Sequence, residues 1–219
     1  MPDERTVTET RDVTGFDGVT LEGFGSVEVT QGDHTALTIE AAEDVMPRVT
    51  AEVKDRVLVL GLRKDGWLDG LRRKKLSIRF SVTMDGIRSL KLSGIGRIDA
   101  PRVDADALSL VVSGTGAIEV SSLSAESLSV VLSGAGSCEV AGKTASQSIK
   151  LSGAGSYSAP DLECTTANAV VSGAGDVTLR VLDTLDAKIS GTGSIRYQGA
   201  PTVLQRVTGV GTVTCTCSD

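Results

Sequence analysis

Three acidic side chains recur at one position of successive segments, and their type and spacing could support acid–base chemistry. Asp99, Glu119 and Glu139 follow one another at intervals of 20 residues. Carboxylates that lie close together shift each other's pKa, and polysaccharide hydrolases use such pairs as acid and base. Those enzymes also need cleft-forming loops, and no bulky loop interrupts this part of the chain. We therefore interpret the carboxylates as a solvated face and assign no catalytic residue; a polysaccharide-active enzyme is an alternative.

A basic segment around the only tryptophan is the second group that could bind a partner. Six Arg and Lys residues surround one Trp and two Leu; the set is Arg63, Lys64, Trp67, Leu68, Leu71, Arg72, Arg73, Lys74 and Lys75. Basic residues beside an aromatic ring suit a membrane surface, an anionic glycan or a protein. The alternative is a solvated hairpin loop whose Trp67 packs on neighbouring strands. This segment is the predicted contact site.

The cysteines and the single histidine give little indication of a metal or cofactor site. Cys138 and Cys215 fall on inward positions of the repeat described below, where free cysteine behaves as a small hydrophobe, so we expect unpaired cysteines. Cys215 and Cys217 could bind a soft metal or bridge two chains. His34 is the only histidine, so no second pair of ligands for a zinc site with these cysteines is apparent. His34 is predicted at the surface. We expect no metal and no cofactor.

A Gly-x-Gly motif recurs through the C-terminal two-thirds of the chain. Successive copies are 18 to 20 residues apart, and serine precedes the first glycine in six of the seven. The pairs are Gly94/Gly96, Gly114/Gly116, Gly134/Gly136, Gly153/Gly155, Gly173/Gly175, Gly191/Gly193 and Gly209/Gly211. Nucleotide-binding motifs need a third glycine or a Gly-Lys-Ser/Thr run, and a helix after it, which this sequence does not supply. Seven copies in register favour a structural role.

Apolar and polar residues alternate on both sides of each glycine pair, which is typical of strands with one buried face. The residue before each serine is apolar, as at Leu92, Val112 and Leu132. A repeat of 18 to 20 residues suits one coil of a β-helix and is too short for a propeller blade. The sequence thus predicts an all-β, single-stranded, right-handed parallel β-helix. Its glycines would allow tight turns or close approach between coils, and its serine hydroxyls would cap turn amides.

The N-terminal third departs from the repeat, although the chain as a whole is predicted to be one domain. Residues 13–40 contain Gly23-Phe24-Gly25 with alternating flanks and are expected to form the first coil. Residues 41–85 are interpreted as an inserted cap with a short helix at 43–46, antiparallel strands at 49–53, 57–62 and 76–82, and the basic loop. Residues 86–219 hold the repetitive coils.

The composition disfavours several partners and leaves the compartment open. Lys and Arg total 22 against 28 Asp and Glu, and the net charge of −6 disfavours nucleic acid and anionic lipid. No stretch approaches the roughly 20 apolar residues of a transmembrane helix, so no transmembrane segment is predicted. The first residues lack the apolar core of a secretion signal. This start does not separate an extracellular or cell-surface location from a cytoplasmic one.

The order of these motifs resembles a known family. The chain contains, in this order, Phe16-Asp17-Gly18-Val19, a Gly-x-Gly strand, a basic insertion and serial Leu-Ser-Gly-x-Gly coils. From about residue 13 to 214 it thereby resembles the putative auto-transporter adhesin head, GIN-domain family of bacteria and archaea. The resemblance implies a right-handed β-helix, exported or lipid-anchored, with a role in adhesion. It implies no catalytic residues.

Two hypotheses of different class follow from these observations. The first is a non-catalytic secreted or cell-surface scaffold that binds an extracellular glycan or protein. The second is a structural protein that assembles into a homo-oligomer through its C-terminal coil, with Cys215 and Cys217 at the assembly edge, because an open β edge is a template for another copy.

Overall fold

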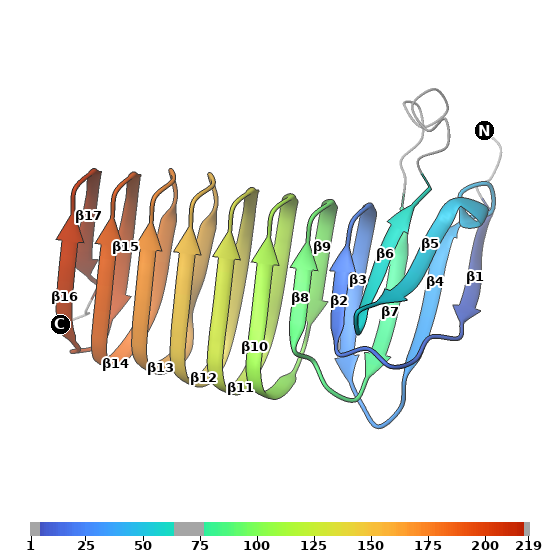
Figure 1. Ribbon diagram of the computed structural model, residues 1–219, viewed down its shortest axis with the longest axis horizontal. Coiled ribbons are helices and arrows are strands. Elements are labelled where there is room, and N and C mark those ends of the chain that lie inside the picture. Colours follow the sequence, from blue (N-terminus) through green and yellow to red (C-terminus); the bar gives the residue numbers. More distant parts are fainter. Residues whose placement is uncertain (1–4, 64–76, 217–219) are drawn as a thin grey trace.

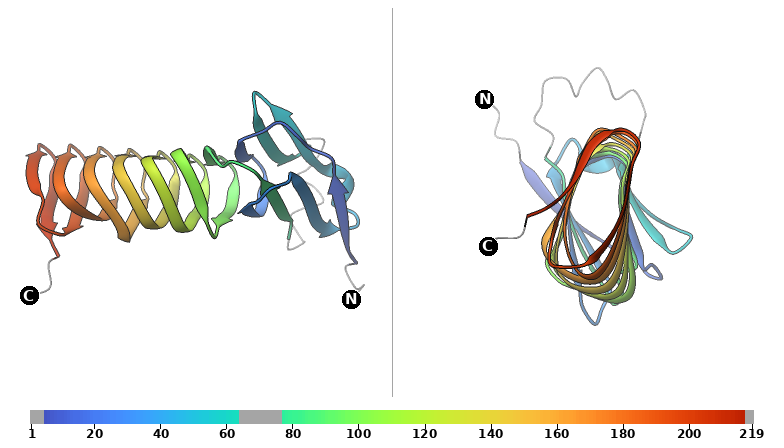
Figure 2. Two further views of the ribbon diagram at one scale, coloured as in Figure 1. Left: turned by 90° about the horizontal axis from the view of Figure 1, so that it is seen from below. Right: turned by 90° about the vertical axis from the view of Figure 1, so that its left-hand side faces the viewer.

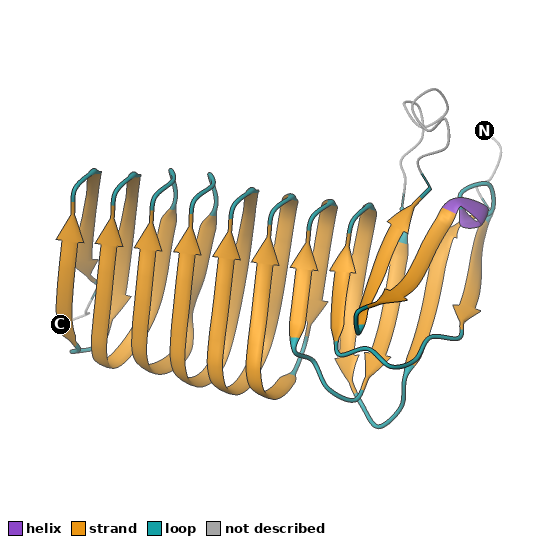
Figure 3. Cartoon of the chain, in the orientation of Figure 1, coloured by secondary structure: helices purple, strands orange, loops and turns teal. Residues whose placement is uncertain are grey.

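The computed structural model describes residues 5–63 and 77–216, and 74% of them lie in strands. Figure 3 shows these strands along the whole stack. The only helical element in these residues is η1 (Met46–Arg48), a single 3₁₀ turn. The strands are β1 (Thr6–Arg11), β2 (Gly18–Leu21), β3 (Phe24–Gln31), β4 (Ala36–Ala42), β5 (Val49–Lys54), β6 (Val57–Leu62), β7 (Arg79–Met84), β8 (Ser89–Leu92), β9 (Ile95–Ala100), β10 (Val103–Val112), β11 (Thr115–Leu132), β12 (Ala135–Leu151), β13 (Ser156–Val171), β14 (Asp176–Ile189), β15 (Thr192–Gln198), β16 (Thr202–Val207) and β17 (Val210–Cys215).

The predicted parallel β-helix is confirmed, as a solenoid of about six turns. Each coil is a flattened oval, seen end-on in Figure 2. Strands β11, β12, β13 and β14 each start in or directly after one Ser-Gly-x-Gly corner. Each strand runs along one face, bends round the opposite edge and returns to the next corner. We call this opposite edge the rounded edge. Parallel register shifts occur there, for example between Val120 and Leu123, so coils of slightly different length can stack.

The inward positions form the core in the way that the alternation predicts. Leu92, Val112 and Leu132 precede successive corners and are buried, and Ile98 and Ile118 line the other face of the interior. Burial of these apolar side chains is the main favourable term in the stability of the stack.

The corners owe their shape to contact between coils. The Leu92 carbonyl accepts hydrogen bonds from the backbone amides of Ser113 (2.9 Å) and Gly114 (3.1 Å) in the next coil, and the later corners repeat this arrangement. The turn amides are therefore satisfied by the preceding coil, and the predicted capping by serine hydroxyls is not what the corner uses. A Cβ atom on Gly134, whose φ is not positive, would overlap the Gly114 carbonyl oxygen. Close approach between coils explains this glycine.

The last described coil corrects one prediction about the cysteines. Cys138 is free and buried, as expected, and Cys164 is free, as expected, and also buried. Cys215, which was expected to be unpaired and inward, is exposed and disulfide-bonded. The inward pattern fails at Cys215 because no described coil stacks on β17 to cover it. Cys217 lies outside the described residues.

The N-terminal end is arranged in an order that the sequence did not indicate. Strands β6 and β7 pair in parallel with β2 and β3, so they form a coil on the outer side of the one that precedes them in the chain (Figure 1). The next coil, β8 and β9, stacks on the other side of β2 and β3. Of the strands expected to be antiparallel, β5 pairs with β6, and β7 pairs with β4. Strand β1 was not predicted and pairs antiparallel with β4.

Two local predictions in this region were wrong in detail. The helix expected at 43–46 is a turn that leads into η1, which includes Pro47, because proline is tolerated in the first turn of a helix. The strand expected at 76–82 is β7, Arg79–Met84.

We expect Gly134→Ala to lower the free energy of unfolding by about 3 kcal/mol, because the new methyl group would collide with backbone rather than with a flexible side chain. The matched control is Gly86→Ala, since a Cβ at Gly86 meets nothing within 4 Å and its φ is not positive. Chemical denaturation of both variants measures the difference. Equal stability of the two would contradict the packing explanation.

Candidate functional site

The predicted basic contact site lies almost entirely outside the described residues. Of its members only Arg63 is described; it is exposed, and its backbone amide donates to the Arg48 carbonyl at 2.9 Å. The chain leaves β6 beside Gly23, at the same edge as the Ser-Gly-x-Gly corners. Arg63 directly follows β6 and Cys215 ends β17, and these two strands lie towards opposite ends of the stack (Figure 1). The structure therefore does not bring these predicted site residues together.

The three predicted acidic residues form a column on one face. Asp99, Glu119 and Glu139 are register partners on β9, β11 and β12. Arg97 lies against this column: its Nε donates to Asp99 at 2.5 Å and its guanidinium also contacts Glu119. The hydrogen bond with Asp99 raises the pKa of Arg97. The column is thus partly neutralised, and the described residues contain no cluster of acidic, Cys or His side chains suited to a metal.

The buried titratable groups do not form a reaction site. Burial raises the pKa of Cys138, and it raises that of Cys164 to about 11, so both thiols stay protonated at neutral pH. The Tyr157 hydroxyl donates to Gln147 Oε1 at 2.9 Å inside the core, and burial raises its pKa as well. His34 is exposed as predicted, 3.0 Å from Asp33.

A groove of about 1460 Å³ runs over the face opposite the acidic column, beside the rounded edge. Its lining includes two rows of outward side chains that cross coil after coil in parallel register. The first row is Ser109, Ser129, Ser148, Asn168 and Asp186; the second is Ala107, Ser127, Ser146, Thr166 and Thr184. We call this surface the hydroxyl groove.

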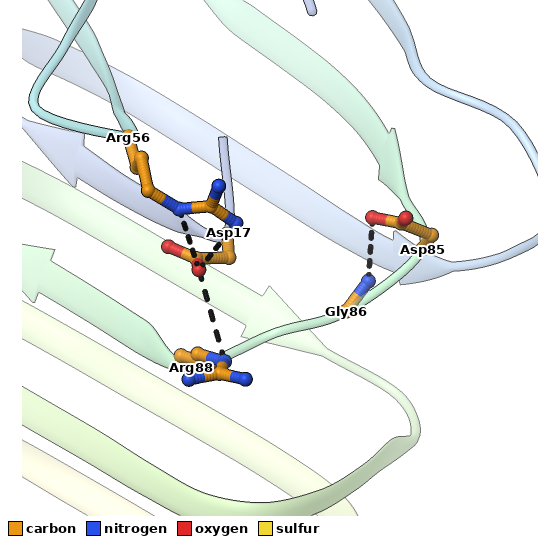
Figure 4. A network of polar contacts seen from close by, with 5 residues as sticks. All are labelled: Asp17, Arg56, Asp85, Gly86 and Arg88. Atoms are coloured by element: carbon orange, nitrogen blue, oxygen red, sulfur yellow. Dashed lines mark hydrogen bonds and ion pairs between the residues drawn. The ribbon is translucent and has the colours of Figure 1, made fainter. Parts of the chain in front are cut away.

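The loop between β7 and β8 closes the N-terminal end of the hydroxyl groove. Gln31 fixes it, because its amide nitrogen donates to the carbonyls of Asp85 (3.2 Å) and Asp104 (2.9 Å) and its oxygen accepts from the Asp104 amide at 2.7 Å. Arg88 in the same loop lies 3.7 Å from Asp17, which also binds Arg56 at 2.9 Å (Figure 4). These contacts tie the end of the groove to the N-terminal coils.

Acidic side chains dominate the charge of the groove. Its lining contains five carboxylates and two basic groups: Asp85, Asp104, Asp106, Glu126 and Asp186 against Arg88 and Lys143. Asp104, Asp106 and Glu126 lie where the coils begin to bend, next to the hydroxyl rows. The groove therefore favours neutral or cationic ligands over anionic ones.

The groove was not predicted, although its rows are visible in the repeat. Aligning the second half of each coil places Ser109, Ser129 and Ser148 at one outward position. That alignment shows a polar row but does not show that the surface is concave, because concavity depends on the loop at Asp85–Arg88 and on the rounded edge.

The parallel stack of coils places this chain in the class of β-solenoid proteins. The chain belongs to the family described as "Putative auto-transporter adhesin, head GIN domain", whose model matches residues 15–201. This confirms the family that the sequence resembles.

Solved structures of similar fold are named putative adhesins in two cases and a putative lipid binding protein in a third. A putative adhesin from Bacteroides fragilis is 24% identical with a TM-score of 0.87, and the match covers 98% of each chain. A putative lipid binding protein from Parabacteroides distasonis is 19% identical with a TM-score of 0.75, covering 96% of each chain. A putative adhesin from Parabacteroides merdae is 21% identical with a TM-score of 0.74, covering 97% of this chain and 96% of the other. At these identities the likeness shows the fold.

No curated protein matches the chain. Within residues 5–63 and 77–216, no helix has the length and apolar character needed to cross a membrane.

We expect Arg97→Gln to destabilise the protein by about 1 kcal/mol at pH 7, because the acidic column would lose its counter-charge at an exposed site. Repulsion among the carboxylates would then oppose folding as long as they are ionised. The loss of stability is therefore present at pH 7 and shrinks as the pH falls towards about 4.

Lys150→Gln is the control, since it removes one positive charge from an exposed site on the opposite face that has no ion pair among the described residues. Urea denaturation at several pH values measures both variants. A deficit for Arg97→Gln that does not depend on pH would contradict the electrostatic explanation.

Proposed function

We propose that this protein is a non-catalytic adhesin-like module of the cell surface that binds an extracellular glycan or protein in the hydroxyl groove. The observation that carries the proposal is the groove itself, about 1460 Å³ in volume and lined by polar rows that cross five successive strand segments. Concave surfaces with convergent polar groups are the usual place for ligands. The family description, an adhesin head, supports the same role.

The environment of the groove carboxylates favours binding over catalysis. A carboxylic acid that donates a proton at neutral pH needs an apolar site that keeps it protonated. Asp106 and Glu126 are exposed on the rounded edge. They are suited to accept hydrogen bonds from a ligand, and we therefore assign no enzymatic activity.

The disulfide at Cys215 supports placement outside the cytoplasm, because such bonds persist mainly in oxidising compartments. One structural neighbour is named a putative lipid binding protein, and the lining of the hydroxyl groove does include apolar residues such as Ile87 and Leu128. Its two rows of outward hydroxyl and amide side chains favour a polar ligand over an acyl chain.

We expect Ser129→Trp to abolish ligand binding, because the bulky ring would fill the middle of the hydroxyl groove from an exposed position. Ser137→Trp is the matched control, since Ser137 lies outside the groove on the opposite face. Binding of both variants to glycan arrays and to immobilised extracellular proteins measures the effect. Equal binding by the two variants would exclude the groove as the contact site.

Self-assembly through the C-terminal coil is a second candidate function, and a specific observation supports it. Strands β16 and β17 each pair on one side only within the described chain, with β14 and β15 respectively. Val207 is 41% exposed, whereas Ile189, its register partner in the preceding coil, is 1% exposed. Arg206 is the only charged residue in these two strands. Charge is one of the devices that keeps β edges apart, and here it is scarce.

We expect light scattering at high protein concentration to detect oligomers, and Leu204→Lys to shift the population towards monomer by placing a second charge on the edge coil. Leu182→Lys is the control, because Leu182 is also exposed but lies on an inner coil. A strictly monomeric protein would rule out this second function and leave the groove proposal unaffected.

A further inference from the structure

We infer that the ligand of the hydroxyl groove is a linear glycan that carries hydroxyl and free amino groups and no acidic groups. The inference rests on the proposed function, since it takes the groove as the binding site. It adds the chemical class of the ligand, which follows from the spacing, the free hydrogen-bonding groups and the charges of the groove.

The spacing of the groove suits an extended polymer. Neighbouring members of each row lie on adjacent parallel strands, roughly 4.8 Å apart, so a row of five spans about 19 Å along the helix axis. The two rows are two residues apart on each strand, as for Ser127 and Ser129, which separates them by roughly 6.6 Å. This regular array repeats the same groups along one direction. A linear polymer can present hydroxyl groups at each of its units to such an array.

The first row has hydrogen-bonding capacity that the protein does not use. Ser129, Ser148 and Asn168 have side chains on the groove, and none makes a side-chain hydrogen bond to another described residue. Ser127 and Ser146 in the second row donate weakly to backbone carbonyls, at 3.5 and 3.4 Å. Hydroxyl and amide groups both donate and accept, as sugar hydroxyls do. Because these side chains stand on a packed sheet, little ordering is needed when a ligand binds.

The charges of the groove point to amino groups on the ligand. Both basic side chains of the lining already face carboxylates: Arg88 lies 3.7 Å from Asp17, and Lys143 lies 3.6 Å from Glu163.

Four carboxylates in the lining are not matched in this way. Asp85, Asp104, Asp106 and Glu126 have no ion-pair partner among the described residues, although Asp85 accepts a hydrogen bond from the Gly86 amide at 2.9 Å. Asp186 has Lys188 at 2.7 Å. An ammonium group on the ligand would satisfy these carboxylates, and a uronic acid would be repelled.

The lining residues also imply that binding affinity depends on the length of the glycan. The groove residues in the described chain include no aromatic side chain on which a sugar ring could stack. Recognition therefore depends on many hydrogen bonds of modest strength. Affinity should rise with the number of sugar units until the chain covers the rows, and then level off.

The test compares three probes of matched length with the full chain by calorimetry. They are oligomers of β-1,4-linked glucosamine, the same oligomers fully N-acetylated, and oligomers of galacturonic acid. We expect the glucosamine oligomer to bind most tightly, its acetylated form more weakly, and the acidic oligomer not at all. The first two probes share a backbone and differ in charge, so their comparison isolates the amino group.

The protein variants connect the preference to the groove. Asp106→Asn combined with Glu126→Gln should weaken binding of the glucosamine oligomer about tenfold, with little effect on the acetylated one. Glu139→Gln is the control, because it removes a carboxylate from the opposite face. Circular dichroism verifies that the variants are folded.

Several results would overturn the inference. Tightest binding of the acidic oligomer, or no binding of any of the three probes, would exclude this ligand class. The inference would also be excluded if Glu139→Gln changed the preference for the glucosamine oligomer over its acetylated form while Asp106→Asn with Glu126→Gln left that preference unchanged. If a basic peptide or a protein binds instead and Ser129→Trp abolishes that binding, the proposed function stands and only the ligand class is wrong. If Ser129→Trp affects no ligand, the proposed function itself fails.

Discussion

The rest of the structure depends on backbone contact between coils at the Ser-Gly-x-Gly corners. At each corner two amides share one carbonyl of the preceding coil, and a side chain on the first glycine would overlap that coil's backbone. Because the contact is backbone to backbone, every coil must turn at the same height and in the same orientation as its neighbour. The corners therefore set the parallel register that carries through both faces of the helix.

Strict register turns each outward position of the repeat into a straight row of side chains. On one face the rows place Asp99, Glu119 and Glu139 side by side, where Arg97 compensates part of their charge. On the other face they place serine, threonine and asparagine along a groove in which Asp104, Asp106 and Glu126 have no ion-pair partner among the described residues. The two faces share one architecture and differ in whether the protein neutralises its own charge. That difference makes the groove face the better candidate for a ligand.

The edge strands at the two ends of the stack differ in their pairing and in their charge. Antiparallel strands β1, β4 and β5 extend the sheet beyond the N-terminal coil, and they carry charged residues such as Glu9, Arg11 and Lys54. The last described coil keeps the parallel arrangement, exposes apolar side chains that inner coils bury, and carries one charge in its two strands. An edge of this kind invites pairing, whereas the N-terminal edge discourages it.

The sequence by itself determined the coil, because the glycine spacing indicates where each coil turns and the period-two alternation indicates which side chains face inward. It therefore predicted the β-helix, its inward residues, the buried free Cys138 and the register of the acidic column. Only the tertiary structure decided three other features. The coil of β6 and β7 stacks outside the one that precedes it, Cys215 lies uncovered at the last described coil, and a loop held by Gln31 closes a groove. Each feature depends on contacts between segments that are far apart in the sequence. The repeat pattern within one coil does not indicate which distant segments that coil will contact.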